Sequence, residues 1–366
     1  MSLKCTAHIL RDIAGGHGEL GADEYGKTVG DEDLLRNRVA FTSFLYRPAD
    51  ALLYCGITAY DADIFYTFDP ATAQFTSLRW QEVGEPFEVK IHRSLCQAPD
   101  GKIYAATAAL HDITRRLDAP GGKIFSYDPA TSEYESLCTP SPPDYIQTIT
   151  LDPERRIIYG FTYPVFKFFK YDIDADEVTD FDYVGSITHI SALDDDGKLW
   201  GTWHPRTHNL FCYDPEADEI TWFRHSVPNA QAGSDIMYPG AGPVDCMING
   251  GDGYIYIGTT LGELVRLDPK TAAVEFLGKP YPEMRMPGLT IAEDGLIYGC
   301  GGDGGAGQLF TYDRESRAFH LLGNVDDGEQ TCYRTHDLAL VGDRIFVAET
   351  DNPDRSGYLW ECQVND

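Results

Sequence analysis

Basic residues are scarce in this chain. Only 29 lysines and arginines stand against 58 aspartates and glutamates in 366 residues, so the formal net charge is −29. Nucleic-acid-binding proteins gain much of their affinity from basic residues that face phosphates, and the composition therefore argues against a nucleic-acid partner. The mean field also repels anions, so an anionic ligand would need a local basic pocket.

Long hydrophobic runs are missing as well. No stretch approaches the roughly 18 to 20 apolar residues that a membrane span requires. The first ten residues lack both a long apolar run and a small-residue cleavage site, so they do not read as a signal peptide. We therefore expect no membrane partner and a cytoplasmic location. A periplasmic or secreted location would apply if a leader had been removed.

Paired cysteines at redox or metal-binding spacing are also absent. The nine cysteines are an odd number and include no Cys-x-x-Cys. Several of them, such as Cys55, Cys212 and Cys362, lie inside apolar strand patterns and are expected to be small buried hydrophobes. This usage favours a reducing compartment.

Familiar catalytic motifs are not found either. The sequence has no Gly-x-Ser-x-Gly, no P-loop and no His-Glu-x-x-His. The glycine run from Gly299 to Gly307 follows one expected strand and leads into another, so it is a loop and not a dinucleotide-binding turn. We expect no nucleotide cofactor.

What the sequence does contain is a repeat whose copies lie 41 to 56 residues apart. Each copy carries a strand related to Ile-Tyr-x-Gly, usually followed by a strand that ends in Tyr-Asp-Pro or a variant of it. The seven copies of the first strand begin at Leu53-Tyr54, Ile103-Tyr104, Ile158-Tyr159, Leu199-Trp200, Ile255-Tyr256, Ile297-Tyr298 and Ile345-Phe346.

The turn chemistry of the repeat indicates its fold. Asp-Gly suits a tight hairpin turn. In Asp-Pro the proline fixes φ, and the aspartate side chain can accept a hydrogen bond from the backbone amide two residues further on. Four short strands per unit at this period predict an all-β, seven-bladed β-propeller with four-stranded antiparallel blades, formed by residues 1–366 as a single domain. An open solenoid is the alternative, but it would leave sheet edges exposed.

The last repeat stops after its third strand, near Cys362. A strand close to the N-terminus, around Cys5–Leu10, could supply the missing fourth strand and close the ring.

Functional residues of a propeller are expected as polar side chains on the innermost strands and at the exits of the second strands. His92 fits the first position, and His111 and Tyr163 fit the second. Basic residues near these positions, Arg93, Arg206 and Arg334, could form the local basic pocket that an anionic substrate needs. The alternatives remain hydrogen-bonded polar residues near turns for the histidines, packing for Tyr163, and solvated rim charges for the arginines.

Two histidines and two cysteines are predicted to converge on the channel from different blades. His189, Cys246, Cys332 and His336 would suit one tetrahedral structural zinc ion. The competing interpretation is two buried thiols and two hydrogen-bonded histidines.

This pattern of residues resembles that of the seven-bladed propeller polysaccharide lyases that cleave ulvan. It consists of the pair His92 and His111, Tyr163 on the next blade, and the His/Cys set. The resemblance implies β-elimination, with His92 and His111 as partners of the uronate carboxylate, Tyr163 as base and acid, and a structural zinc. The arginine expected shortly after the tyrosine is replaced here by Lys167 and Lys170, and Arg206 could substitute for it.

This chemistry is reasonable in itself. A proton next to a carboxylate becomes acidic once the carboxylate is neutralised, and nearby cations can lower the pKa of a tyrosine base. We expect an anionic, uronate-containing polysaccharide or oligosaccharide as partner. The alternatives are a non-catalytic ligand- or protein-binding propeller and another propeller enzyme, a lactonase or an antibiotic lyase.

Overall fold

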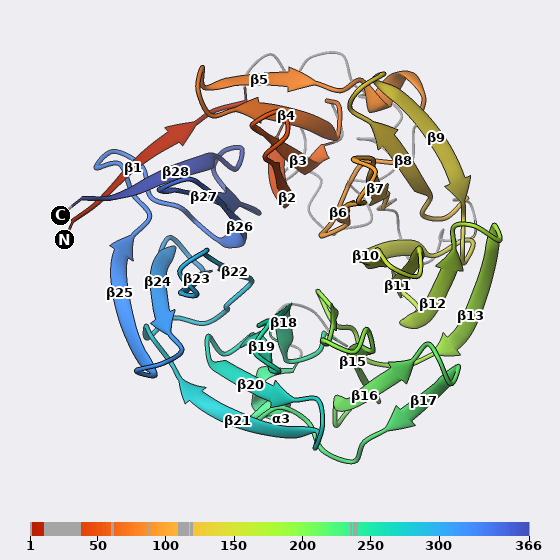
Figure 1. Cartoon of the computed structure of the whole chain (residues 1–366). Helices are drawn as coiled ribbons and strands as arrows, with labels where there is room; N and C mark the ends of the chain where they lie inside the picture. The colour runs from red at the N-terminus through yellow and green to blue at the C-terminus, as the bar shows by residue number, and fades with distance from the viewer. Residues whose placement is uncertain are drawn as a thin grey trace.

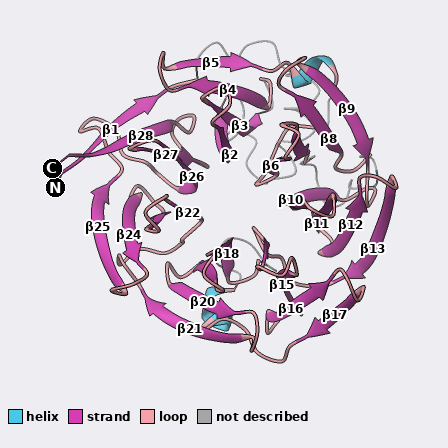
Figure 2. Ribbon diagram, viewed as in Figure 1, coloured by secondary structure: helices cyan, strands magenta, loops and turns pink. Residues whose placement is uncertain are grey.

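A computed structural model describes residues 2–10, 38–59, 62–85, 88–108, 117, 120–234, 236 and 241–365. In these ranges the chain forms seven four-stranded antiparallel sheets arranged in a ring (Figure 1). Almost all regular structure is strand (Figure 2), with short helical turns at η2 (Trp80–Glu82) and α3 (Ala230–Gly233). The seven-bladed propeller expected from the repeat is confirmed.

The blades follow one another along the chain. Blade one holds β2 (Val39–Arg47), β3 (Leu52–Ala59), β4 (Phe65–Asp69) and β5 (Gln74–Ser77); blade two β6 (Leu95–Gln97), β7 (Ile103–Ala106), β8 (Ile124–Asp128) and β9 (Glu133–Cys138); blade three β10 (Tyr145–Asp152), β11 (Ile157–Tyr163), β12 (Lys167–Asp172) and β13 (Glu177–Tyr183). Blade four holds β14 (Ala192–Leu193), β15 (Leu199–Trp203), β16 (Asn209–Asp214) and β17 (Glu219–Trp222); blade five β18 (Val244–Asn249), β19 (Ile255–Thr259), β20 (Leu264–Asp268) and β21 (Ala273–Gly278). Blade six holds β22 (Gly288–Ile291), β23 (Ile297–Gly301), β24 (Gln308–Asp313) and β25 (Ala318–Asn324); blade seven β26 (Thr335–Val341), β27 (Arg344–Glu349), β28 (Leu359–Asn365) and β1 (Ser2–His8).

Blade seven joins the two ends of the chain. β1 pairs antiparallel with β28, with Cys5 opposite Cys362, so the N-terminal strand is the outer strand of the last blade. The two termini lie side by side at this blade (Figure 1). The expected ring closure is therefore confirmed.

Deleting residues 2–8 is expected to destabilise the protein strongly. The deletion removes the β1–β28 ladder, in which each backbone hydrogen bond contributes about 0.5–1.5 kcal/mol, and it leaves β28 as an open sheet edge. Denaturant unfolding should show the lower stability, and size-exclusion chromatography should show association. Thr6→Ala, an exposed change within β1, is the control. A truncated protein as stable as the control would contradict the closure.

The aspartate turn that recurs after the third strand of several blades has a clear physical basis. Asp69 Oδ1 accepts a hydrogen bond from the Ala71 amide at 2.8 Å, and Asp268 Oδ1 accepts one from the Lys270 amide at 2.9 Å. The turn ends with a residue in the left-handed region, such as Ala73 at φ 55°. The aspartate thus satisfies a turn amide that the sheet leaves unpaired.

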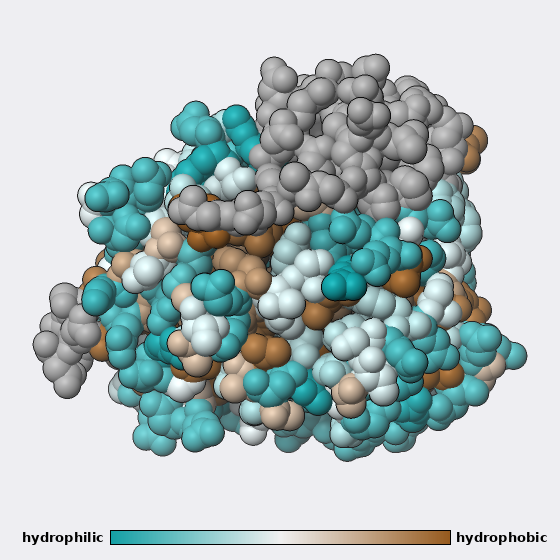
Figure 3. Space-filling model, turned by 90° about the horizontal axis from the view of Figure 1, so that it is seen from above, coloured by the Kyte–Doolittle hydropathy of each residue, from teal (hydrophilic) through white to brown (hydrophobic). Residues whose placement is uncertain are grey.

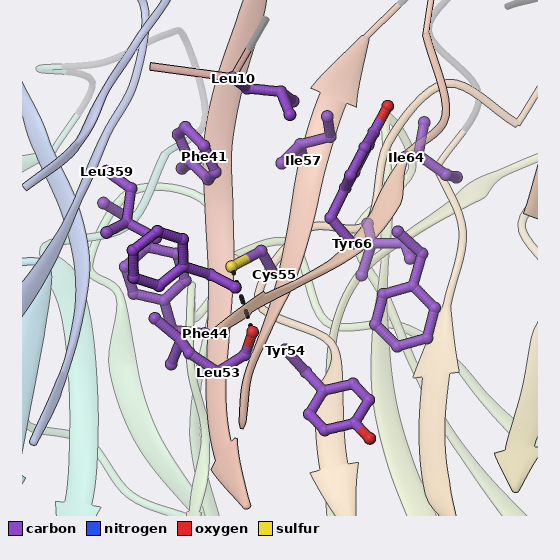
Figure 4. Packing of buried hydrophobic residues seen from close by; sticks show 14 of the residues in the cluster. Leu10, Phe41, Phe44, Leu53, Tyr54, Cys55, Ile57, Ile64, Tyr66 and Leu359 are labelled. Atoms are coloured by element: carbon purple, nitrogen blue, oxygen red, sulfur yellow. Dashed lines mark hydrogen bonds between the residues drawn. The ribbon is translucent and has the colours of Figure 1, made fainter. Parts of the chain in front are cut away.

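The glycine of the Ile-Tyr-x-Gly strand lets neighbouring blades approach closely. A Cβ placed on Gly56 would lie 2.7 Å from Cγ2 of Ile91, which belongs to the next blade. Any side chain at this position would push the blades apart. Apolar residues fill the rest of the interface, as in the cluster around Phe41, Phe44 and Leu359, which joins blades one and seven (Figure 4).

The two faces of the ring differ in their connections. The first-to-second and third-to-fourth strand turns, such as 48–51 and 173–176, are short and lie on one face, which we call the turn face. Many second-to-third strand and blade-to-blade connections, such as 184–191 and 325–334, are longer and lie on the other, the loop face. In side view the described surface is mainly hydrophilic, with scattered apolar patches (Figure 3). Within the described ranges, no helix combines the length and apolar composition of a membrane span.

Candidate functional site

The first strand of each blade lies nearest the centre of the ring (Figure 1). In blades one, three, five and seven its register against the second strand shifts by one residue, and the extra residues are Thr42, Gln147, Asp245 and His336. All four are polar and buried. Since a β-bulge can re-aim a side chain, these shifts account for four of the buried polar residues on the inner strands.

An ionic network spans the channel at this level. Arg93 of blade two donates through its terminal nitrogens to the carbonyl oxygens of Asp245, in blade five, and of His336, in blade seven. Arg285 binds the Asp245 carboxylate with two hydrogen bonds of 3.0 and 3.1 Å. Burial disfavours ionisation of Asp245, but Arg285 and Arg93 outweigh it and lower its pKa to about 2. The carboxylate is therefore charged at neutral pH.

His92 and His336 form a hydrogen bond between their Nε2 atoms, 3.1 Å apart. His92 Nδ1 lies 2.7 Å from the carbonyl oxygen of Gln147, which can only accept, so Nδ1 carries the proton when His92 is neutral. His92 Nε2 is then an acceptor, and His336 must donate from its own Nε2. The lone pair of neutral His336 consequently resides on Nδ1, a buried atom with no hydrogen-bond partner among the described residues.

Both histidines are neutral near physiological pH. Burial lowers the pKa of His92 well below 6.5, and Lys90 and Arg93 lower it further. Burial, Arg93 and His92 act in the same way on the pKa of His336. A third histidine, His189, lies with its ring centroid 6.3 Å from that of His92. Burial lowers the pKa of His189 to about 3.

Lys90 adds an amine to this group. It precedes His92 by two residues, and its backbone bridges Thr58 of blade one and Ala108 of blade two. Burial lowers the pKa of Lys90 to about 8. The charge of Asp351 partly offsets this by raising the pKa, and the charge of Arg93 lowers it further. The centre of a strongly acidic protein thus carries Lys90, Arg93 and Arg285 beside neutral imidazoles.

The other catalytic residues expected from the sequence are placed less centrally. His111 lies outside the described residues. Tyr163 is the last residue of β11, and its ring packs at centroid distances of 5.0 Å from Tyr145 and 5.7 Å from Phe166, both in its own blade. Burial raises the pKa of Tyr163, so its phenol stays protonated.

Of the expected substrate-binding residues, only Arg93 lies in the channel network. Lys167 Nζ contacts Ser141 Oγ at 3.1 Å and Asp180 at 3.5 Å. Arg334 is paired with Asp303 and Asp351. Arg206 is an exposed residue of the β15–β16 connection.

The four expected zinc ligands are not gathered in one place. Cys246 belongs to a hydrophobic cluster of blades five and six, and Cys332 to a cluster around blades six and seven. Burial raises the pKa of both thiols well above 9, and Cys246 Sγ donates to the Met286 carbonyl oxygen at 3.1 Å. The described residues hold no group of three or more His, Cys, Asp or Glu suited to a metal ion. As placed, these residues do not fit zinc, and the metal content stays a prediction.

The sequence analysis missed Lys90 and Arg285 as members of the site. Lys90 lies two residues before His92 on the same inner segment, and this closeness in sequence could have identified it as a channel residue. Arg285 precedes β22, outside the strand pattern, and its role depends on the bulge that presents Asp245.

Comparison with solved structures finds the same architecture in virginiamycin B lyase from Staphylococcus aureus, crystallised as a catalytically inactive histidine-to-alanine variant with quinupristin. The two chains are 12% identical, the alignment covers 100% of both, and the TM-score is 0.67. A structural-genomics protein of unknown function from Bacteroides thetaiotaomicron is 14% identical over 76% of this chain and 72% of that chain, with a TM-score of 0.46. No protein-family model and no curated protein matches the sequence. The structural similarity establishes a shared propeller fold.

Proposed function

We propose that this protein is a carbon–oxygen lyase that cleaves a uronate-containing polysaccharide or oligosaccharide by β-elimination in the loop-face half of the channel. The observation that carries the proposal is the directed hydrogen bond from His336 to His92. It leaves the Nδ1 lone pair of a neutral, buried imidazole as a proton acceptor beside cationic side chains.

The reaction needs a cation as well as a base. A C–H group next to a carboxylate is only weakly acidic while the carboxylate keeps its charge, and a neighbouring ammonium or guanidinium group lowers the energy of the carbanion-like transition state. Lys90 is the candidate partner of the substrate carboxylate because it lies on the segment that carries His92. It also provides local positive charge in a protein whose net charge is −29.

The proton transfers divide between two residues. His336 Nδ1 takes the proton next to the carboxylate, the C–H electrons form the new C=C bond, and the bond to the glycosidic oxygen breaks. Tyr163 protonates the leaving oxygen, a role that suits a phenol whose pKa is raised by burial. His92 holds the His336 tautomer and shares the proton through the Nε2 contact. His111 remains a proposed second partner of the carboxylate.

An antibiotic lyase is the second candidate. One solved propeller of the same architecture is an inactive variant of virginiamycin B lyase with quinupristin. The same base and cations would serve an elimination next to any carbonyl group, so quinupristin belongs in the substrate screen beside uronate polysaccharides.

Tyr163→Phe is expected to abolish elimination while leaving polysaccharide binding nearly intact, because it removes only the proton-transfer group. His92→Ala should lower the rate, because His336 loses the acceptor that fixes its tautomer, and should change binding much less, because Lys90 is the assigned partner of the carboxylate. The measurement is the absorbance of the unsaturated product, with binding followed separately by calorimetry. Tyr183→Phe, at an exposed tyrosine of β13, is the matched control. Full activity of Tyr163→Phe would remove this residue from the mechanism, and no product from any uronate polymer would contradict the proposed substrate.

A further inference from the structure

The junction between β1 and β28 differs from the matching junction in the other blades. In blades one to six a hairpin joins the third strand to the fourth, as residues 70–73 join β4 to β5. In blade seven the third strand is β28, at the end of the chain, and the fourth is β1, at its start. No hairpin links these two strands, so the closure of the ring rests on contacts between the two ends of the chain.

Two cysteines face each other at this junction. Cys5 lies directly opposite Cys362 in the antiparallel register. Residues opposite each other in such a ladder have Cα atoms about 4.5–5.5 Å apart and side chains on the same side of the sheet. A disulfide spans a Cα separation of about 4.4–6.8 Å, so the backbone already meets its requirement.

Both thiols point toward blade six. Cys5 Sγ lies 3.8 Å from the carbonyl oxygen of Asn324, the last residue of β25. Lys4 and Thr6, on either side of Cys5, are exposed, as expected for strand residues that point the other way. Cys362 is fully buried and belongs to the same apolar cluster as Cys5. The two sulfur atoms therefore share the interface between blades six and seven.

The contact between the thiols makes them unequal. A hydrogen bond from Cys362 lowers the pKa of Cys5, although burial acts in the opposite direction. The same contact, together with burial, raises the pKa of Cys362 well above 9. Cys5 is also the less buried of the two, with 7% of its surface exposed against 0% for Cys362. Because the thiolate is the attacking species in disulfide exchange, Cys5 is the thiol that reacts first.

We propose that Cys5 and Cys362 form a redox-modification site, whose disulfide covalently locks the ring closed. The inference is independent of the proposed lyase activity, because both residues lie on the outer strands of blade seven and not in the channel.

The oxidant is a small disulfide of the glutathione type, which reaches Cys5 when the terminal strand β1 opens locally. The Cys5 thiolate attacks one sulfur of the oxidant, and the first glutathione leaves as a thiol. Cys362 then attacks the Cys5 sulfur in the mixed disulfide and releases the second glutathione. One S–S bond forms in the protein and one breaks in the oxidant, and the two protons and two electrons of the protein thiols end on two glutathione thiols.

Mass spectrometry of the full chain tests the pairing. The native protein is incubated with glutathione disulfide, the remaining thiols are alkylated, and the digest is searched for linked peptides. The main product should join Cys5 to Cys362 and should disappear after treatment with dithiothreitol. Free thiols at both positions, glutathione retained on Cys5, or a link from Cys362 to Cys332, which belongs to the same cluster, would overturn the proposal.

Thermal unfolding tests the locking role. The linked protein should melt about 3–5 °C above the reduced protein, because a disulfide between the chain ends restricts the unfolded state. Cys5→Ala should abolish this shift, and Cys362→Ala provides a second test if Cys5→Ala does not fold. Cys212→Ala is the matched control, because Cys212 is also 7% exposed but lies opposite Trp200 and Thr221, and it should keep the shift. Equal melting of the linked and reduced proteins, a shift retained in folded Cys5→Ala, or a shift lost in Cys212→Ala would contradict the lock.

Discussion

Replacing His336 by alanine is expected to lower the rate of elimination by about 10²- to 10⁴-fold, the usual contribution of a positioned general base. The change removes the Nδ1 lone pair and also the donor that His92 Nε2 accepts. Substrate binding should change much less, because the carboxylate partner assigned to Lys90 remains. Product absorbance gives the rate, and calorimetry on an inactive background gives the affinity.

Added imidazole distinguishes a chemical role from a packing role. It can occupy the space left by the His336→Ala side chain and supply a new lone pair, so part of the lost rate should return in proportion to its concentration. A merely destabilised variant would show no such recovery. His320→Ala, an exposed histidine of β25, is the control and should retain full activity. An unaffected rate in His336→Ala would assign the base to another residue.

The propeller could be predicted from the sequence because its signals are local and repeated. Each Ile-Tyr-x-Gly strand carries its own reason for the fold: apolar residues for the interface, and in copies such as Gly56 a small residue where the next blade approaches. The aspartate before each turn likewise satisfies an amide two residues away, as Asp69 does for Ala71. The closing strand followed from a missing fourth strand in blade seven.

The site could be predicted only in part, because it depends on where bulges fall. His92, His189 and His336 were expected in the channel, and the structure brings their rings together. A one-residue shift reverses the side to which a strand residue points, and nothing in the sequence marks that shift at Asp245 or His336. Cys246 follows its bulge directly and therefore packs between blades.

The channel also resolves a conflict in the charge pattern. A net charge of −29 repels anions at long range, yet the centre of the ring is lined by Lys90, Arg93 and Arg285. The acids lie mainly on the surface, where water and salt screen them. Arg93 and Arg285 are buried and Lys90 is half-buried, so their charges are screened less. A local site for a carboxylate is therefore compatible with an acidic protein. The affinity of this site for a carboxylate should therefore depend less on ionic strength than the affinity of a surface site would.

Asp245→Ala is expected to cause the largest loss of stability of any single substitution in the channel. It leaves Arg93 and Arg285 buried without their shared carboxylate, and removing one partner of a buried ion pair typically destabilises a protein by about 3–5 kcal/mol. Both arginines are fully or almost fully buried, so water cannot replace the lost partner without opening the channel. Denaturant unfolding followed by tryptophan fluorescence measures the change.

A double-mutant cycle separates the ion pair from the shape of the side chain. Asp245→Asn keeps the volume and removes the charge, and Arg285→Gln removes the opposite charge. Because each single change leaves an unpaired buried ion, the double variant should lose less stability than the sum of the two single variants. Asp174→Ala is the surface control, since Asp174 is exposed, its partner Arg156 is partly exposed, and such pairs contribute only about 0–1 kcal/mol. Additive losses in the cycle would show that Asp245 and Arg285 are not energetically coupled, which would contradict a stabilising buried ion pair.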